Sequence, residues 1–177
     1  STVFAAHPPS ETAVVSDDVD REWSARTARR LIREEASQLA GSADEKRMAL
    51  ANIFSRTHAI SQQDRDSRLS MLWIAADLFH PGFEQPLTKH YEDSLEDDDD
   101  IVRSWAIQLA TEEAGKPKLS SETLLKLAQS DPSPTVRLAL ASALPNLDAE
   151  TAWEVGSALA MRAEDKNDRF LPRMIWF

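Results

Sequence analysis

Hydrophobic residues recur every three or four positions along most of this chain, which is the spacing that gives an α-helix one apolar face. The clearest stretch predicts a helix that begins near Pro134, where the missing N–H of proline costs nothing, with Ser133 as its cap. A partner helix is predicted to begin at Asp148. The apolar positions of these two helices are Val136, Ala139, Leu140, Ala143, Leu144 and Leu147, then Trp153, Val155, Leu159 and Met161.

The same periodicity predicts further helices closer to the N-terminus. Ser42 and Glu45 have the spacing of a capping box, ahead of a helix that includes residues 48–54. Other helical stretches are expected at 23–36, 69–79, 86–91, 102–110 and 124–128, and a last one contains residues 174–176. Residues 1–16 are expected to form an extended tail, so the helical domain is predicted to span residues 17–177.

The helical stretches also repeat in sequence. The segment from Asp131 to Arg137 recurs 34 residues upstream, from Asp97 to Arg103, and each copy opens a predicted helix. The alignment matches four anchor residues, Leu69, Val102, Val136 and Phe170, and a more distant fifth, Trp23. An aspartate stands five residues before each anchor, in the same order at Asp64, Asp97, Asp131, Asp165 and Asp18. Tetratricopeptide and ankyrin signatures are absent, whereas Asp-x5-Arg at the start of a first helix is typical of HEAT-like repeats. We therefore predict an all-α fold, an α-α superhelix of about four complete HEAT-like hairpins plus the start of a fifth.

The repeated aspartate and arginine are predicted to form a structural ladder. Asp97 and Asp131 can accept backbone N–H bonds at the start of each first helix, and Arg103 and Arg137 can reach the same level of the neighbouring repeat. The alternative, that the two arginines bind an anionic ligand, is weaker because recurrence at the repeat spacing is explained by the architecture.

An acidic run precedes the helix that begins near Ile101. Its four aspartates, Asp97, Asp98, Asp99 and Asp100, are weak candidates for a calcium site. The run lacks the Gly and the distal Glu of an EF-hand loop, and carboxylates at a helix N-terminus are favourable without any metal. A solvated helix cap is therefore the preferred interpretation.

No pattern in the sequence predicts a catalytic or cofactor-binding residue. The four histidines have no metal-ligand spacing, and neither a phosphate-binding loop nor a nucleophile elbow occurs. A net charge of −10 and a pI near 4.8 argue against nucleic acid as a partner. No apolar run approaches the roughly 20 residues of a membrane span, so no direct membrane insertion is expected.

The tryptophans are predicted to divide between core and interface. Trp73, Trp105 and Trp153 lie on or beside apolar stripes and are expected in the core. Trp176 lies near the end of the chain and is a candidate interface residue. The chain opens with Ser1 rather than Met and stops at Phe177, shortly after a fifth helix begins, so we expect a piece of a larger protein.

Several segments together resemble one known family. They are Val102–Leu109, Leu127–Leu138, Ala141–Leu144, Trp153–Glu154, Arg162–Asp165 and Leu171–Trp176. In these the chain looks like the HEAT-repeat region of PVC-type membrane-bound dehydrogenase proteins. The resemblance implies a large extracytoplasmic bacterial protein in which a β-propeller similar to sugar dehydrogenases, a HEAT-like region and a haem-binding c-type cytochrome module are joined.

The resemblance brings no active site into this segment. The chain contains no cysteine, so Cys-x-x-Cys-His is absent and covalent haem attachment here is excluded. We expect a non-catalytic scaffold or protein-interaction module that contacts neighbouring domains or a partner protein. A wall of an oxidoreductase substrate or haem pocket, and a free-standing adaptor, are the alternatives. Extracytoplasmic localisation rests on the resemblance, and the lack of cysteine equally fits a cytoplasmic protein.

Overall fold

A computed structural model describes residues 41–60, 65–77 and 84–176, with positions 27, 30, 31, 34 and 38. This part of the chain is helical and contains no strand, which confirms the predicted all-α class. The α-helices are α2 (Ala43–Ile60), α3 (Arg65–Asp77), α4 (Glu84–Ser94), α5 (Asp100–Ala110), α6 (Ser121–Ser130), α7 (Pro134–Ala143), α8 (Ala149–Ala160) and α9 (Leu171–Trp176). Two short 3-10 helices are η1 (Leu144–Asn146) and η2 (Ala163–Asp165). The predicted tail 1–16 and the aspartates Asp18 and Asp64 lie outside the described residues, as do Trp23 and most of the helix expected at 23–36.

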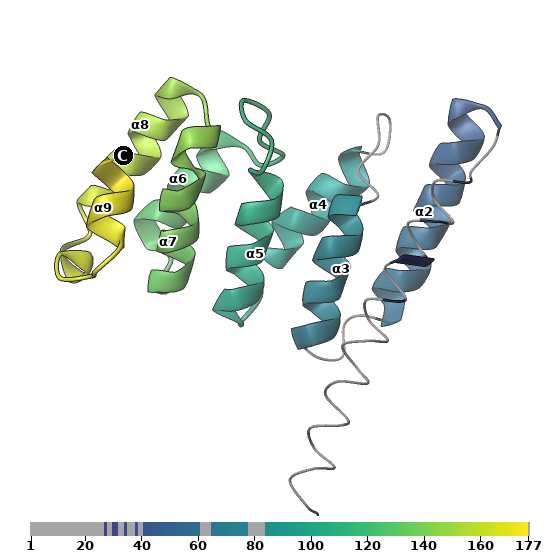
Figure 1. The fold of residues 1–177 in the computed structure, drawn as a ribbon, viewed down its shortest axis with the longest axis horizontal. Helices are drawn as coiled ribbons and strands as arrows, with labels where there is room; N and C mark the ends of the chain where they lie inside the picture. The colour runs from purple at the N-terminus through teal and green to yellow at the C-terminus, as the bar shows by residue number, and fades with distance from the viewer. Residues whose placement is uncertain are drawn as a thin grey trace, which may run out of the picture.

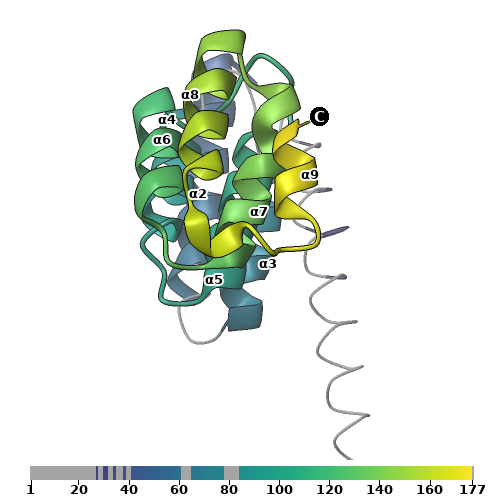
Figure 2. The same cartoon turned by 90° about the vertical axis from the view of Figure 1, so that its left-hand side faces the viewer.

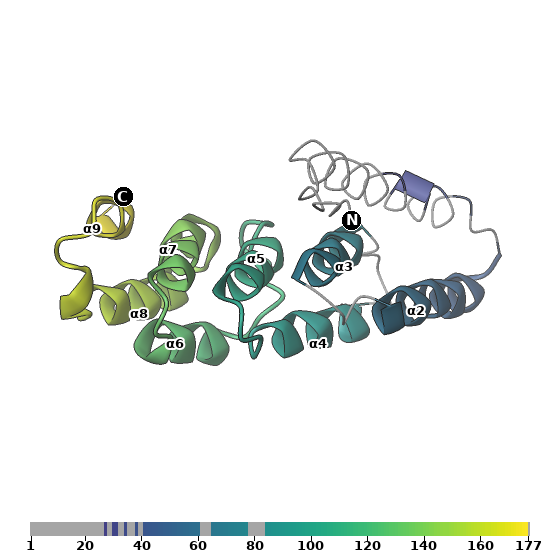
Figure 3. The same cartoon turned by 90° about the horizontal axis from the view of Figure 1, so that it is seen from below.

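The helices follow one another in a row and are arranged in two layers (Figure 1). Figure 3 shows α3, α5, α7 and α9 in one layer and α2, α4, α6 and α8 in the other. Within the first layer α5 packs against α3 and α7, and α7 packs against α9; in the second layer α6 packs against α8. Seen along the row, α8 and α9 form the end nearest the viewer (Figure 2). The chain therefore alternates between layers from one helix to the next.

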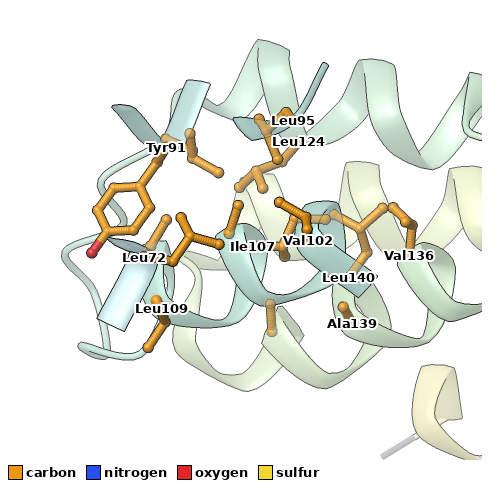
Figure 4. Close-up of a cluster of buried hydrophobic side chains, with 14 of the residues drawn as sticks. Leu72, Tyr91, Leu95, Val102, Ile107, Leu109, Leu124, Val136, Ala139 and Leu140 are labelled. Atoms are coloured by element: carbon orange, nitrogen blue, oxygen red, sulfur yellow. The ribbon is translucent and has the colours of Figure 1, made fainter. Parts of the chain in front are cut away.

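The core lies between the two layers. Leu124 of α6 is fully buried and belongs to the same cluster as Val102 and Ile107 of α5 and Leu140 of α7 from the opposite layer (Figure 4). Tyr91 of α4 is also fully buried. Because each helix contributes an apolar face to a shared interior, no single hairpin holds a complete core of its own.

The predicted helix starts agree with the observed caps. Ser133 Oγ accepts from the Thr135 N–H at 3.1 Å, and Pro134 occupies the first helical position of α7. Asp148 caps α8 through the N–H groups of the second and third residues that follow. The capping box is confirmed as well: the Ser42 N–H donates to Glu45 at 2.7 Å, and the Glu45 N–H donates to Ser42 Oγ at 3.3 Å.

Ser120 supplies a cap that the sequence pattern did not reveal, and it allows a simple test. Its Oγ accepts from the Thr123 N–H at 3.1 Å at the start of α6. We expect Ser120→Ala to lower the free energy of unfolding by about 1 kcal/mol, because one N–H of the first turn loses its acceptor. Ser120→Asn, which keeps an acceptor, should unfold at a urea concentration close to that of the parent. Equal losses in both variants would contradict this role.

The helix that begins at Pro134 is shorter than its apolar pattern suggested. α7 ends at Ala143, and the chain continues as the 3-10 helix η1, which contains Pro145. Proline has no N–H to donate to the carbonyl four residues earlier, so α-helical bonding stops there. Leu144 and Leu147 are consequently only half-buried at the edge of the core.

Two positions of the predicted repeat alignment are wrong. The buried residues of α3, namely Met71, Leu72, Ile74 and Ala75, match Ala106, Ile107, Leu109 and Ala110 of α5 at a spacing of 35. Leu69 is therefore not the counterpart of Val102, and it is only half-buried. At the other end, Phe170 is 55% exposed and Leu171 is 1% exposed. One extra residue between Asp165 and α9 moves the buried position from Phe170 to Leu171.

The prediction that Trp153 belongs to the core is also wrong. Trp153 is 77% exposed and Met161 is 82% exposed, whereas α8 buries Thr151, Val155 and Leu159. Trp153 lies two residues from Thr151 and from Val155, which turns its side chain about 200° away from the buried face. Trp73 and Trp105 do pack against the core, half-buried, with ring centroids 4.8 Å apart. None of the described helices is long and apolar enough to cross a membrane.

Candidate functional site

A line of arginine–aspartate bridges links successive helices of the first layer. Arg103 of α5 donates through Nε and Nη2 to both carboxylate oxygens of Asp131, at 3.0 and 3.2 Å. Arg137 of α7 does the same with Asp165, at 2.5 and 2.6 Å. Each arginine thus reaches the loop that leads into the next helix of its layer, 28 residues further along the chain. Two parallel N–H···O bonds fix both the distance and the orientation of the helices they join.

Each arginine also holds the loop that precedes its own helix. Arg103 Nη1 donates to the Asp97 carbonyl at 2.7 Å, and Arg137 Nη1 donates to the Asp131 carbonyl at 3.1 Å. The aspartates in turn organise these loops, because Asp97 accepts from the Asp99 N–H and Asp131 from the Ser133 N–H. The ladder residues predicted from the sequence are therefore joined in series: Arg103 contacts both Asp97 and Asp131, and Arg137 contacts Asp131.

A third bridge involves Arg68, which the repeat alignment missed. Arg68 Nη2 donates to Asp97 Oδ1 at 3.4 Å and Nε lies 2.7 Å from Asp97 Oδ2, so an ion pair also links α3 to the loop before α5. Arg68 lies one residue before Leu69, which the alignment matched to Val102 and Val136. Arg103 and Arg137 instead lie one residue after these two valines. The spacing of 35 residues that matches the buried positions of α3 and α5 also pairs Arg68 with Arg103. A search for arginine at this spacing would therefore have found Arg68.

Arg162 is a further residue that no sequence signal indicated. Its Nη1 donates to the Gln129 carbonyl at 2.5 Å and its Nη2 to the Asp131 carbonyl at 2.9 Å. These carbonyls lie at the end of α6, where backbone acceptors lack partners within the helix. Because Arg162 follows α8 and binds the end of α6, it connects two helices of the second layer. It does so beside Asp131, the aspartate that connects α5 to the loop before α7 in the first layer.

Burial sets the electrostatic character of the ladder. The side chains of the Arg137–Asp165 pair are 3% and 10% exposed, compared with 26% and 14% for Arg68 and Asp97. Hydrogen bonding to Asp165 raises the pKa of Arg137, and hydrogen bonding to Asp131 raises the pKa of Arg103. Both guanidinium groups remain charged, and their donors point at protein oxygens. This arrangement favours a structural role over binding of an anionic ligand.

The four aspartates of the acidic run point to different partners. Asp97 pairs with Arg68, while Asp99 caps α5 through the Ile101 N–H and lies 3.8 Å from Arg65. Asp100 accepts from Ser133 Oγ, and Asp98 is exposed. The carboxylates of Asp97, Asp99 and Asp100 are thus used in capping and bridging rather than directed at one point. Among the described residues no group of three or more potential metal ligands comes together.

The contact between Asp100 and Ser133 predicts a pH dependence. Donation from Ser133 Oγ at 2.5 Å lowers the pKa of Asp100 below its ordinary 3.8, with smaller contributions from Thr135 and Arg103. Since the folded state favours the ionised form, this stabilisation is present above the unfolded pKa and disappears as the pH falls through the folded pKa.

We therefore expect Asp100→Asn to be less stable than the parent at neutral pH, and this difference to shrink below about pH 4. Urea unfolding at a series of pH values measures it. In a Ser133→Ala background the pH dependence of the Asp100→Asn effect should be weaker. A difference that stays constant from neutral to acid pH would contradict the assignment.

Trp176, the predicted interface residue, is 89% exposed at the end of α9. Phe170, just before this short helix, and Met174 within it are 55% and 38% exposed. The ladder and this apolar end are therefore separate features of the molecule. In comparisons with known proteins, no family model, curated protein or solved structure matches this chain.

Proposed function

We propose that this chain is a non-catalytic helical-repeat scaffold or protein-interaction module. The observation that carries the proposal is the buried ladder, in which every bridge joins one helix of the first layer to the loop before the next. Such bridges fix the spacing of successive hairpins and hold a long surface in a constant shape. Their charged groups are saturated by the protein, and no reactive constellation accompanies them in the part of the chain that the structure describes.

The two alternating layers support a finer architectural proposal, an α-α superhelix of HEAT-like hairpins. One arginine–aspartate bridge per step, and an apolar core shared between neighbouring hairpins, are what a stacked helical array requires. In such arrays binding is spread over a broad surface instead of being concentrated in one pocket. The partner would accordingly be a neighbouring domain of a larger protein or a separate protein.

The resemblance to PVC-type membrane-bound dehydrogenase proteins supports a place for this scaffold inside an extracytoplasmic oxidoreductase. In this proposal, neighbouring domains carry the dehydrogenase chemistry and the haem, and the helical segment sets their separation. The rival functions are a wall of the substrate or haem pocket and an independent adaptor.

An antibody raised against this chain tests the proposal on a native cell fraction run beside a haem-stained gel. If the segment belongs to a cytochrome-containing protein, the antibody marks a large haem-positive band. If it marks only a haem-negative species near 19.8 kDa, the oxidoreductase setting is wrong and an independent adaptor is favoured.

A further inference from the structure

The outward face of α8 carries a tryptophan that no described helix covers. This face lies within about 120° of the helix circumference and comprises Glu150, Trp153, Glu154, Ser157, Ala160 and Met161. Trp153 is 77% exposed, and Met161 at the end of the helix is 82% exposed. Figure 3 shows α8 beside α6 in the second layer, with the first layer on the other side of both helices. The small side chains of Ser157 and Ala160 leave room beside the indole ring along the second half of α8.

A further helix of the second layer would not cover Trp153. α6 and α8 each bury two apolar residues four positions apart, Leu124 and Ala128 in α6 and Val155 and Leu159 in α8. By this match Trp153 has the position that Glu122 has in α6, and Glu122 is exposed although α8 packs against α6. A helix that packed on α8 as α8 packs on α6 would therefore leave Trp153 open. This separates Trp153 from side chains that face the next helix of the row.

The charges on the outward face of α8 indicate the chemistry of a partner. Glu150 lies one helical turn before Trp153 and Glu154 directly follows it, and both are exposed. Their carboxylates form no hydrogen bond or ion pair with other described residues. α8 contains no lysine, arginine or histidine, and Arg162 just after it donates to backbone carbonyls at the end of α6. An exposed indole beside two carboxylates without a counter-charge is complementary to an apolar side chain flanked by lysine or arginine.

Two other occupants fit this face less well. Two copies of the chain that met through it would bring Glu150 and Glu154 of both copies together, and like charges oppose such pairing. The headgroups of an anionic membrane would meet the same carboxylates and be repelled by them. A positively charged protein segment has neither disadvantage.

We propose that the outward face of α8 binds a basic amphipathic helix of a partner protein. The partner helix lies along α8, packs an apolar side chain on Trp153 and places lysine or arginine side chains beside Glu150 and Glu154. Small residues on one helix allow another helix to approach closely, and Ser157 and Ala160 supply them here. This inference rests on the proposed function as an interaction module and gives that module a partner of defined chemistry.

Binding of a synthetic amphipathic helix to the full 177-residue chain tests the proposal. The probe is a fluorescein-labelled peptide of about 15 residues with leucine at the apolar helix positions and lysine at the polar ones. A second peptide has glutamate in place of lysine. We expect fluorescence anisotropy to show binding of the lysine peptide alone. Trp153→Ala and Glu154→Lys should each weaken this binding about tenfold, because an aromatic anchor or a charged contact is lost.

Matched control variants separate this face from the acidic surface as a whole. Trp176→Ala removes a tryptophan that is 89% exposed on α9, and Glu96→Lys makes the same charge change at an exposed carboxylate ahead of α5. Both should bind the lysine peptide as the parent does, and circular dichroism verifies that every variant keeps its helical content. Labelling with 5-fluorotryptophan adds a local readout of the five tryptophans. The fluorine resonance that is missing in Trp153→Phe should be the one that the peptide shifts.

Three results would overturn the proposal: equal binding of the glutamate peptide, an effect of Glu96→Lys as large as that of Glu154→Lys, or a peptide-induced shift at another tryptophan instead of Trp153. A Trp153 resonance that shifts with protein concentration in the absence of peptide would assign the face to a second copy and also overturn it. The outcome is separate from that of the antibody experiment. A large haem-positive band without peptide binding keeps the scaffold and removes the docking face. Peptide binding without such a band keeps the docking face and removes the oxidoreductase setting.

Discussion

Replacing Arg137 by alanine is expected to lower the free energy of unfolding by about 3–5 kcal/mol, the range for breaking one side of a buried ion pair. The Arg137 side chain is 3% exposed and provides both hydrogen bonds that Asp165 receives from a side chain. Its loss leaves a buried carboxylate without a counter-charge and also frees the Asp131 carbonyl from one donor. Urea unfolding followed by helical circular dichroism measures the change.

Two controls separate the buried pair from a general effect of removing charge. Lys89→Ala breaks an ion pair with Asp93 in which both side chains are mostly exposed, and its effect should be too small to resolve in the same experiment. The double variant Arg137→Ala with Asp165→Ala should be more stable than Arg137→Ala alone, because the unpaired carboxylate is gone. A single variant that unfolds like the parent would show that the ladder contributes little.

Leu140→Ala is expected to cost about 2–5 kcal/mol, the range for truncating a fully buried leucine in a rigid core. Leu140 is 0% exposed and lies on α7 among the side chains shared by the two layers (Figure 4). Truncation removes apolar contacts and leaves a cavity that the bridged helices cannot close easily. The midpoint of urea unfolding should fall accordingly.

Leu138→Ala is the matched control, since it makes the same change two residues away on the same helix. Leu138 is half-buried, so the same truncation opens onto solvent and should cost clearly less. Equal costs at the two positions would mean that the core between the layers is not tightly packed. A similar loss for Leu140→Ala and Arg137→Ala would indicate that the apolar and the charged contacts between hairpins matter equally.

The ladder connects the stability of the packed helices to the proposed role of the chain. Asp131 receives both bonds from Arg103, accepts from the Ser133 N–H, and offers its carbonyl to Arg137 and Arg162. One loop residue therefore contacts three arginines, one from α5, one from α7 and one from the segment after α8. A scaffold needs this property because the distance between whatever binds at its two ends depends on the sum of many small helix-to-helix angles.

Features that depend on near neighbours along the chain could be predicted from the amino-acid sequence. Helical periodicity and caps such as Ser133 and Asp148 involve residues within a few positions of one another, so their pattern can be read directly. The recurrence of the aspartate, valine and arginine of Asp97–Arg103 at the same spacing in Asp131–Arg137 also indicated that these side chains have a structural role. Spacing alone could predict a ladder, because a repeated charge pair in a stacked array has only a few partners within reach.

Tertiary structure alone decided which residues meet between helices and which face solvent. Arg68 joins the ladder and Leu171 replaces Phe170 in the core, because a helix can shift by one residue at each loop without any change in its own periodicity. Trp153 is exposed because the packing of α8 against α6 selects the face with Thr151, Val155 and Leu159. Local spacing gives the period of a helix, whereas its rotation and offset against its neighbours are fixed only by the contacts that the packed layers make.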